Sequence, residues 1–281
     1  MRVHVIETGT VRIKTAQLVA RRPAPLSLVD VFTDPNWSGW VPTYAFAIET
    51  GEGVIVVDTG QATYLLEEMK HSPHPFIRGN AAFRIEPEQE IGPQLKALGI
   101  GPRDVTKVVL THMHIDHDAG LMHFPNSQFL AAPGEIAKAK GVMGMLRGYL
   151  PQRWPSWFDP AALALDDGPY GPFAASKRLT RDGRVIAVAT PGHTPAHVSV
   201  IVEDDDAAIF MAGDTSYTEA NLLAGNVDGV SPDQAVSRQT LAAIRQFASE
   251  RPTVYLPAHD PDGATRFVQR QTVPVAMSRA A

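Results

Sequence analysis

The amino-acid sequence predicts an α/β fold in which layers of β-sheet are covered by helices. Short runs of apolar and β-branched residues, typical of buried strands, recur along the 281-residue chain. Helical patterns lie between some of these runs, and this order favours sheets with helices packed on them. No strong linker signal divides the chain, so residues 1–281 are expected to form a single domain.

Strands are expected at ten places, each a short run in which aliphatic and β-branched residues predominate. The ten runs are Arg2–Glu7, Val11–Val19, Tyr44–Glu49, Val54–Val57, Lys107–Leu110, Gln128–Ala131, Arg184–Ala189, Val198–Val202, Ala208–Ala212 and Thr253–Leu256.

Helices are predicted between several of these strands. The first is Ala62–Lys70, and the second is Glu88–Leu98, whose residues Ile91, Leu95 and Leu98 share one face. The second has the apolar spacing of a helix that covers a sheet.

A third predicted helix has the clearest N-terminus. Ser231 and Gln234 have the spacing of a capping box, and Pro232 stands at the first helical position. Apolar residues then recur at helical spacing, which predicts a long amphipathic helix after residue 231.

Composition excludes several classes of protein and of site. The formal net charge of −5 at pH 7 argues against nucleic-acid binding, which requires basic charge. No apolar run is long enough to span a membrane, and no secretory signal is recognised, so a cytoplasmic location is expected. The chain has no cysteine, so a metal ion would have to be held by carboxylates and by some of the ten histidines.

Residues 134–173 differ from the rest of the chain, because they lack strand patterning and are rich in aromatic residues such as Trp154, Trp157 and Phe158. Two interpretations are open. The segment is either a helical insertion that packs its aromatic residues on the body of the domain, or the lip of an apolar substrate pocket.

Three histidines and an aspartate follow one predicted strand within six positions. His112 and His114 are two residues apart, so in extended backbone their imidazoles lie on the same side. Asp116 repeats this step and His117 follows it directly. Composition alone does not account for such a cluster, which predicts a divalent metal site.

Three further candidate ligands, His193, Asp214 and His259, each stand just beyond another predicted strand, beside a Gly or Pro that turns the chain. Because several strand ends can converge on one point, all seven candidates are expected to lie together. One tetrahedral zinc ion needs only three or four ligands, so seven candidates predict two metal ions that share a carboxylate. His197 is expected to support this site or to be structural, not to bind metal.

The run HxHxDH, followed by a separate His, Asp and His at strand ends, resembles the pattern of the metallo-β-lactamase superfamily. The resemblance implies an αββα sandwich, with two packed mixed β-sheets and helices on the outer faces. It also implies that Asp58, in an early strand-Asp-Gly element, supports the metal site from behind its ligands.

The same resemblance implies a role for each candidate ligand. His112, His114 and His193 would bind the first metal ion, Asp116, His117 and His259 the second, and Asp214 would bridge the two.

Within the superfamily, the chain is similar to the N-acyl-homoserine lactonases, the quorum-quenching branch. Tyr217 stands three positions after Asp214 and reproduces their D-x-x-Y motif. This similarity implies a hydrolase that opens a lactone ring by attack of a metal-bridging hydroxide. Tyr217 would stabilise the oxyanion, and Asp116 would protonate the leaving alkoxide.

Zinc is the expected metal, although a site built from nitrogen and oxygen donors also accepts iron, cobalt or manganese. The expected partner is a small-molecule lactone or ester, without nucleic acid or membrane, and the chain could be a monomer or a homodimer. Two alternatives stay open: another ester-type hydrolase (a thioesterase, phosphotriesterase or pyridoxolactonase-like enzyme), or a non-catalytic metal-binding module.

Overall fold

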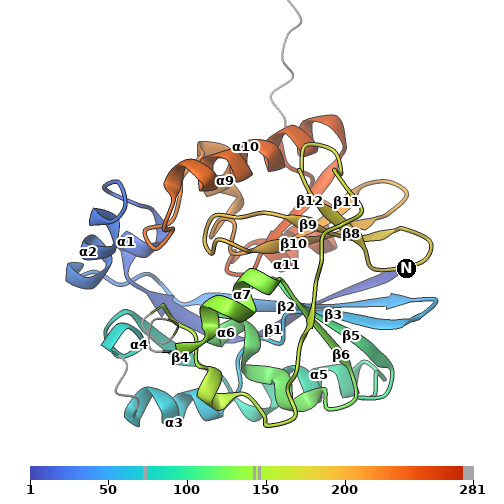
Figure 1. Cartoon of the computed structure of the whole chain (residues 1–281), viewed down its shortest axis with the longest axis horizontal. Coiled ribbons are helices and arrows are strands. Elements are labelled where there is room, and N and C mark those ends of the chain that lie inside the picture. Colours follow the sequence, from blue (N-terminus) through green and yellow to red (C-terminus); the bar gives the residue numbers. More distant parts are fainter. Residues whose placement is uncertain (72–74, 142–143, 145–146, 275–281) are drawn as a thin grey trace, which may run out of the picture.

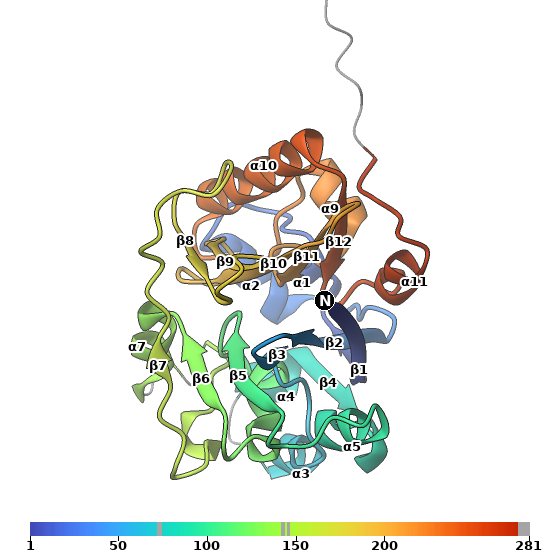
Figure 2. The ribbon, with the colours of Figure 1, turned by 90° about the vertical axis from the view of Figure 1, so that its right-hand side faces the viewer.

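Two β-sheets stacked face to face form the centre of the computed structural model, which describes residues 1–71, 75–141, 144 and 147–274 (Figures 1 and 2). The strands of the first sheet are β1 (Arg2–Ile13), β2 (Val41–Thr50), β3 (Gly53–Val57), β4 (Ala81–Arg84), β5 (Val105–Leu110), β6 (Gln128–Ala131) and β7 (Ala161–Ala162). Those of the second sheet are β8 (Ser176–Arg178), β9 (Val185–Ala189), β10 (Val198–Glu203), β11 (Ala208–Gly213) and β12 (Thr253–Pro257).

Both sheets are mixed. The first has the strand order β4-β1-β2-β3-β5-β6-β7, antiparallel from β4 to β3 and parallel from β3 to β7. The second has the order β12-β11-β10-β9-β8, antiparallel except for the parallel pair of β11 and β12. The parallel pairs matter for the site, because their strands end at the same edge of a sheet.

Alternation along the strands separates the core between the sheets from the cores outside them. In β2, Phe46 and Ile48 pack between the sheets, whereas Ala45 and Ala47 pack on the outer face with helix α5 (Ile91–Ala97). In β10, Val200 packs between the sheets, whereas the next residue packs against helix α10 (Gln234–Glu250). Each sheet is therefore buried on both faces: its inner face packs on the other sheet, and its outer face is covered by helices.

The helices complete an αββα sandwich, as Figure 2 shows, with α9 and α10 beyond one sheet and α3, α4 and α5 beyond the other. The remaining helices and helical turns are α1 (Thr15–Leu18), α2 (Leu26–Thr33), α3 (Tyr64–His71), α4 (Pro75–Asn80), η1 (Pro87–Gln89), α6 (Ile115–Asp118), η2 (Ala119–His123), α7 (Pro133–Ala139), η3 (Pro151–Arg153), α9 (Glu219–Ala224) and α11 (Gly263–Val268). The predicted fold class is confirmed.

The N-terminal region differs from the prediction of two separate strands. A single strand, β1, runs through to Ile13, and its pairing with β2 shifts register around Gly9, which has a φ of 85°. The second predicted run then turns into helix α1, because Asp34 accepts hydrogen bonds from the backbone N–H of Ala16 and the hydroxyl of Thr15. This carboxylate is a helix-starting partner that local strand propensity does not reveal.

Two predicted helices also differ at their ends. Helix α10 begins at Gln234, two residues after the predicted first helical position, Pro232. Asp233 caps it by accepting from the N–H groups of Ala235 and Val236, whereas the Ser231 hydroxyl donates to Asp228. Helix α5 ends at Ala97. The next residue, Leu98, is 45% exposed and does not join the buried face.

The aromatic segment at 134–173 contains α7, η3 and the two-residue β7, and residues 142–143 and 145–146 lie outside the described part. Trp154 and Phe158 pack against the core on the outer face of the first sheet, whereas Trp157 is 41% exposed. Most of these aromatic rings thus cover the body of the protein.

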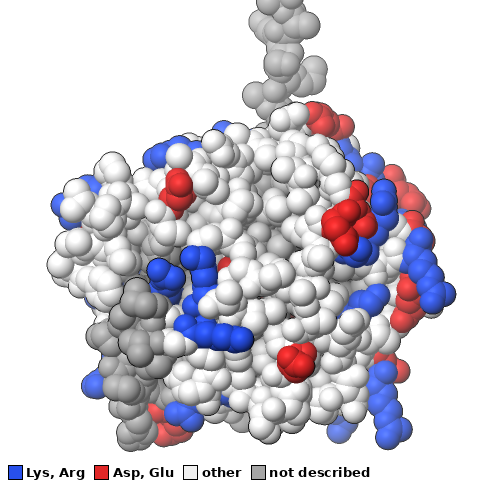
Figure 3. Space-filling view, in the orientation of Figure 1, with Lys and Arg blue, Asp and Glu red and all other residues white. Residues whose placement is uncertain are grey.

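The surface is unevenly charged. On the face seen in Figure 3, uncharged residues cover most of the middle, and a group of Lys and Arg side chains lies left of the centre. In the part of the chain that the structure describes, no helix combines the length and the apolar character needed to cross a membrane.

Candidate metal centre

Loops that follow four strands bring the seven candidate ligands together. After β5 the chain bends at Thr111 and then passes through His112 to His114, whose backbone is extended. Helix α6 begins there, with the N–H of His117 bonded to the carbonyl of His114. This first turn places Asp116 and His117 beside the two preceding histidines. The site therefore starts at the carboxyl end of a parallel strand.

The other three candidates follow strands of the second sheet. His193 lies beyond β9, Asp214 directly follows β11, and His259 follows β12. Gly213, with a φ of 55°, turns the chain before Asp214, and a Cβ at Gly213 would lie 2.6 Å from Nε2 of His197. A side chain has no room there, so glycine is required for this close approach.

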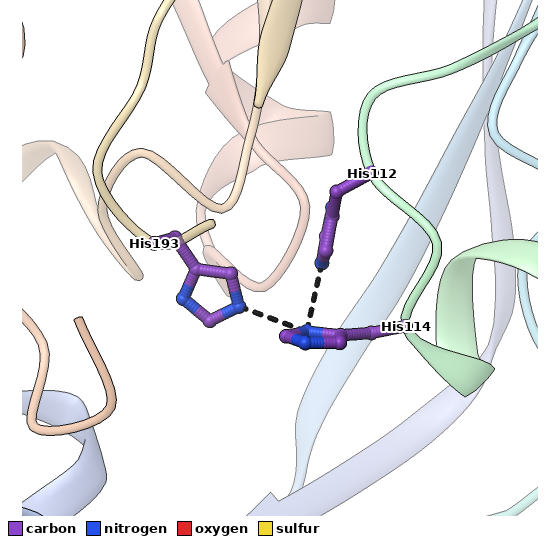
Figure 4. Close-up of side chains that lie close together, drawn as sticks. All are labelled: His112, His114 and His193. Carbon is purple, nitrogen blue, oxygen red and sulfur yellow. Dashed lines mark hydrogen bonds between the residues drawn. The ribbon is translucent and has the colours of Figure 1, made fainter. Parts of the chain in front are cut away.

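The first group of ligand atoms consists of ring nitrogens of His112, His114 and His193. Nδ1 of His114 lies 3.1 Å from Nε2 of His112 and 3.1 Å from Nε2 of His193, as the dashed lines in Figure 4 show. The three nitrogens point at one another from two different sheets (Figure 4). Three converging imidazoles are a donor set suited to zinc and other divalent transition metals.

A second group lies next to the first and consists of Asp116, His117 and His259. Oδ2 of Asp116 is 3.5 Å from Nε2 of His259. Asp214 lies between the two groups. Its Oδ1 is 3.3 Å from Nε2 of His117 and 3.4 Å from Nε2 of His259. Its Oδ2 is 3.5 Å from Nε2 of His193. Each oxygen of Asp214 thus faces a different histidine group.

The four histidines that present Nε2 are each held from behind at Nδ1. The partner oxygens belong to Thr111 (for His112), Asp58 (for His117), Asp228 (for His193) and the backbone of Pro42 (for His259), at 2.9 to 3.2 Å. These contacts fix the ring orientation and direct Nε2 towards the centre.

Asp58 occupies the supporting position that the resemblance implies. It follows β3 with a φ of 57°, an uncommon conformation for a residue other than glycine. Its carboxylate accepts from the N–H and the hydroxyl of Thr111 and contacts Nδ1 of His117. This backbone conformation thus directs the Asp58 carboxylate towards Thr111 and His117, on either side of the other candidate ligands in this loop.

The electrostatics of the site suit metal ligands. Burial lowers the pKa of His112 and of His114 well below the usual value, and neighbouring imidazoles lower it further. Burial alone would raise the pKa of Asp214, but His259 and His117 hold it well below its usual range. Neutral imidazoles and an ionised carboxylate are the forms that bind a metal.

Two buried atoms at the centre have no hydrogen-bond partner among the described residues. They are Nε2 of His117 and Oδ1 of Asp214, which face each other at 3.3 Å. Buried polar atoms are seldom left unpaired, and both are good metal donors. The residues present therefore fit the divalent metal ions implied by the sequence.

The comparison with protein families agrees with this geometry. The model of the metallo-beta-lactamase superfamily matches residues 38–259, which include all seven candidate ligands. The chain belongs to this superfamily. Membership confirms the predicted class of metal-dependent hydrolase, and the superfamily binds divalent metals, typically zinc.

Named relatives of this superfamily member include lactonases. It is 25% identical over 222 residues to an N-acyl homoserine lactonase of a Bacillus species, covering 78% of this chain and 82% of that protein. It is 24% identical over 240 residues to the N-acyl homoserine lactonase AttM of Rhizobium radiobacter, covering 81% and 85%. The predicted resemblance to the lactonase branch is confirmed at this modest identity.

A solved structure of an N-acyl homoserine lactone hydrolase, with the product N-hexanoyl-L-homoserine at its catalytic metal centre, has the same fold. Its TM-score is 0.75 at 19% identity, and the match covers 94% of each chain.

Tyr217 lies against the candidate metal centre of this protein. Its ring stacks on that of His259, with centroids 5.6 Å apart at 28°, and meets the ring of His193 edge-on at 6.5 Å. Burial, and then the charge of Asp214, raise the pKa of Tyr217 well above its usual value, so that the phenol keeps its proton. The sequence placed Tyr217 near the ligands but did not reveal its hydrogen-bond partner, Gln17.

His197 supports the site without facing it. Its Nε2 accepts the backbone N–H of Asp214 at 3.1 Å, and its Nδ1 contacts the hydroxyl of Thr190 at 2.9 Å. This agrees with the expectation that His197 is not a ligand.

Asp228 is a supporting residue that the sequence did not indicate. Burial would lower the pKa of His193, but the Asp228 carboxylate raises it, and the same carboxylate accepts from the hydroxyl and the N–H of Ser231. No spacing rule links Asp228 to His193, because the contact joins two loops that meet only in the folded chain.

Asp228→Asn is expected to weaken metal binding about 10- to 100-fold, since the neutral amide orients and polarises His193 less than the carboxylate does. Competition with a chromogenic chelator measures the affinity. Asp233→Asn, at the start of α10, is the control and should match wild type. Unchanged affinity in Asp228→Asn would show that the contact does not tune the ligand.

Asp118, for which the sequence suggested no role, anchors the aromatic segment. Its buried carboxyl accepts a 2.7 Å hydrogen bond from the indole N–H of Trp154. Burial raises the pKa of Asp118 to about 8, whereas this hydrogen bond favours the ionised form.

Trp154→Phe is expected to lower the free energy of unfolding by about 1–3 kcal/mol, because it leaves the Asp118 carboxyl buried without its donor. Urea unfolding at fixed metal content measures the effect. Trp157→Phe, which changes a half-exposed ring, should cost less, and an equal cost for both variants would count against the hydrogen bond as the cause.

Proposed function

We propose that this protein opens the lactone ring of N-acyl-homoserine lactones by hydrolysis. One observation carries the proposal: the two oxygens of Asp214 face two different histidine groups, and the phenol of Tyr217 lies against both groups. An arrangement of this kind provides two metal positions and a neutral hydrogen-bond donor at one point. The lactonase relatives, at about a quarter identity, support this choice of substrate class.

The proposal includes two metal ions in each chain, with zinc as the first candidate. His112, His114 and His193 would hold one ion and Asp116, His117 and His259 the other, with Asp214 between them. Protein purified without chelator should then contain close to two equivalents of metal by elemental analysis. A reproducible value of one at saturation would contradict the two-ion site.

Metal ions held by the seven candidate ligands would supply Lewis-acid chemistry: they would polarise the lactone carbonyl and lower the pKa of water enough for attack at neutral pH. The hydroxyl of Tyr217 donates a hydrogen bond to the carbonyl oxygen as that oxygen gains negative charge. The carboxylate of Asp116 takes the proton that the attacking water loses. It then delivers this proton to the ring oxygen as the ester bond breaks, which yields the hydroxy acid.

A panel of substrates tests this function with metal-replete protein. It contains acyl-homoserine lactones of several chain lengths, an aryl ester, a thioester and a phosphotriester, with Asp214→Ala as the blank. We expect the highest kcat/KM for a lactone. A higher value for another substrate would assign the site to a different ester hydrolase, and no turnover of any substrate would favour a metal-binding module.

A further inference from the structure

Gln17 reaches the candidate site from a part of the chain where the sequence indicates no function. It lies in helix α1, directly after β1, and its side-chain N–H donates to the hydroxyl of Tyr217 at 2.9 Å. Its backbone is fixed on both sides, because its N–H donates to the carbonyl of Lys14 and its carbonyl accepts the N–H of Gly229, each at 2.9 Å. The backbone of Gln17 is therefore held in place, and its side chain extends from this fixed point to Tyr217.

The burial of Gln17 calls for an explanation. The residue is only 9% exposed, and its amide oxygen has no hydrogen-bond partner among the described residues. Burying an amide with one unpaired atom costs stability. Among the described residues, the contact with Tyr217 is the one hydrogen bond of this side chain, so packing needs alone do not account for a glutamine here.

The hydrogen bond decides what the phenol can do. A phenolic hydroxyl has one proton and accepts through its lone pairs. Since the oxygen of Tyr217 accepts from Gln17, its own proton points elsewhere, and no other described residue takes it. The ring cannot turn freely, because it is stacked on His259.

We propose that Gln17 is a positioning residue that keeps the Tyr217 proton free for the oxygen of the substrate carbonyl. The proposal rests on the proposed ester hydrolysis and extends it to a residue about 200 positions away in the chain. A donor already in place costs no reorganisation when charge develops on the substrate oxygen.

Two variants of Gln17 test the direction of the hydrogen bond. Gln17→Leu removes the donor and should lower kcat about 3- to 10-fold with little change in KM, the value expected for one neutral hydrogen bond. Gln17→Glu has nearly the same shape, but an ionised carboxylate can only accept hydrogen bonds. The phenol would then donate to this carboxylate and no longer to the substrate oxygen. The kcat of this variant should fall at least as far, and wild-type kcat in Gln17→Glu would overturn the proposal.

A double-mutant cycle separates positioning from general damage. Gln17→Leu should cause no further loss in a Tyr217→Phe background, because the hydroxyl that it positions is absent. Gln234→Leu is the matched control, since Gln234 is 8% exposed and its amide donates one hydrogen bond, to the carbonyl of Arg22. Additive losses in the cycle, or an equal loss in Gln234→Leu, would overturn the proposal.

A spectroscopic readout does not depend on the substrate. With ¹³C at the ring carbon that bears the hydroxyl, the six tyrosines give six signals, and the signal lost in Tyr217→Phe is that of Tyr217. It should shift in Gln17→Leu and stay in place in Gln234→Leu, at equal metal content; an unmoved signal would overturn the proposal. The kinetic cycle uses whichever ester the panel ranks first, so a different substrate class would overturn the lactone assignment alone.

Discussion

Asp214→Ala is expected to abolish hydrolysis and to leave less than one metal ion in each chain. The two oxygens of Asp214 face opposite histidine groups at 3.3 to 3.5 Å, so no other side chain replaces it at both positions. Loss of metal assistance worth several kcal/mol corresponds to a fall in kcat/KM of about 10³-fold or more. Elemental analysis and assay of the same preparation measure both effects.

The substitution also removes the negative charge of the Asp214 carboxylate, which three histidines face. His117, His193 and His259 all have a pKa above the usual value; burial alone would lower it, and Asp214 is among the carboxylates that raise it. Without this carboxylate the site attracts cations less strongly, which adds to the loss of metal.

Asp233→Ala is a control for the general effect of removing an aspartate. It takes away the N-cap of α10 and should cost about 1 kcal/mol of stability while metal content and activity stay normal. Two equivalents of metal in Asp214→Ala, or turnover near wild type, would refute the proposed bridging role of Asp214.

Much of the site could be predicted because it follows a general rule of chain geometry. Apolar strands are easily recognised, and polar residues that directly follow them, such as His112 after β5 and Asp214 after β11, lie at the ends of sheets. The i, i+2 spacing predicts that His112 and His114 lie side by side. Their ring nitrogens are 3.1 Å apart, and the backbone at His114 is extended, with a ψ of 155°.

The supporting contacts could not be predicted, because they join segments that meet only after folding. The hydrogen bond from Gln17 to Tyr217 spans 200 positions, and that from His193 to Asp228 spans 35. The oxygen behind His259 belongs to the backbone of Pro42, and residue type carries no information about such a contact.

The same limit applied to the N-terminal elements. Strand propensity continued past Ile13, but the Asp34 carboxylate made the following residues helical, and this helix carries Gln17 into the site. The hydrogen bond to Asp34, formed only in the folded chain, outweighs the local strand propensity of the segment that contains Gln17.

Asp116→Asn is expected to separate metal binding from proton transfer. Oδ2 of Asp116 lies 3.5 Å from Nε2 of His259, and the side chain is 17% exposed, so a substrate can reach it. The oxygen of an asparagine amide can still bind a metal ion, but the amide cannot take up and deliver a proton. We therefore expect kcat on a lactone to fall about 10²- to 10⁴-fold while most of the metal is retained.

The leaving group provides an internal control for this variant. The alkoxide released from a lactone needs a proton, whereas the phenolate released from a nitrophenyl ester is stable without one. Asp116→Asn should lose proton uptake from the attacking water on both substrates, but proton delivery matters only for the lactone. The loss should therefore be smaller on the nitrophenyl ester, so that the ratio of the two kcat values changes by at least about tenfold. Equal losses on both substrates at full metal content would mean that Asp116 does not deliver the proton, which then reaches the ring oxygen by another route.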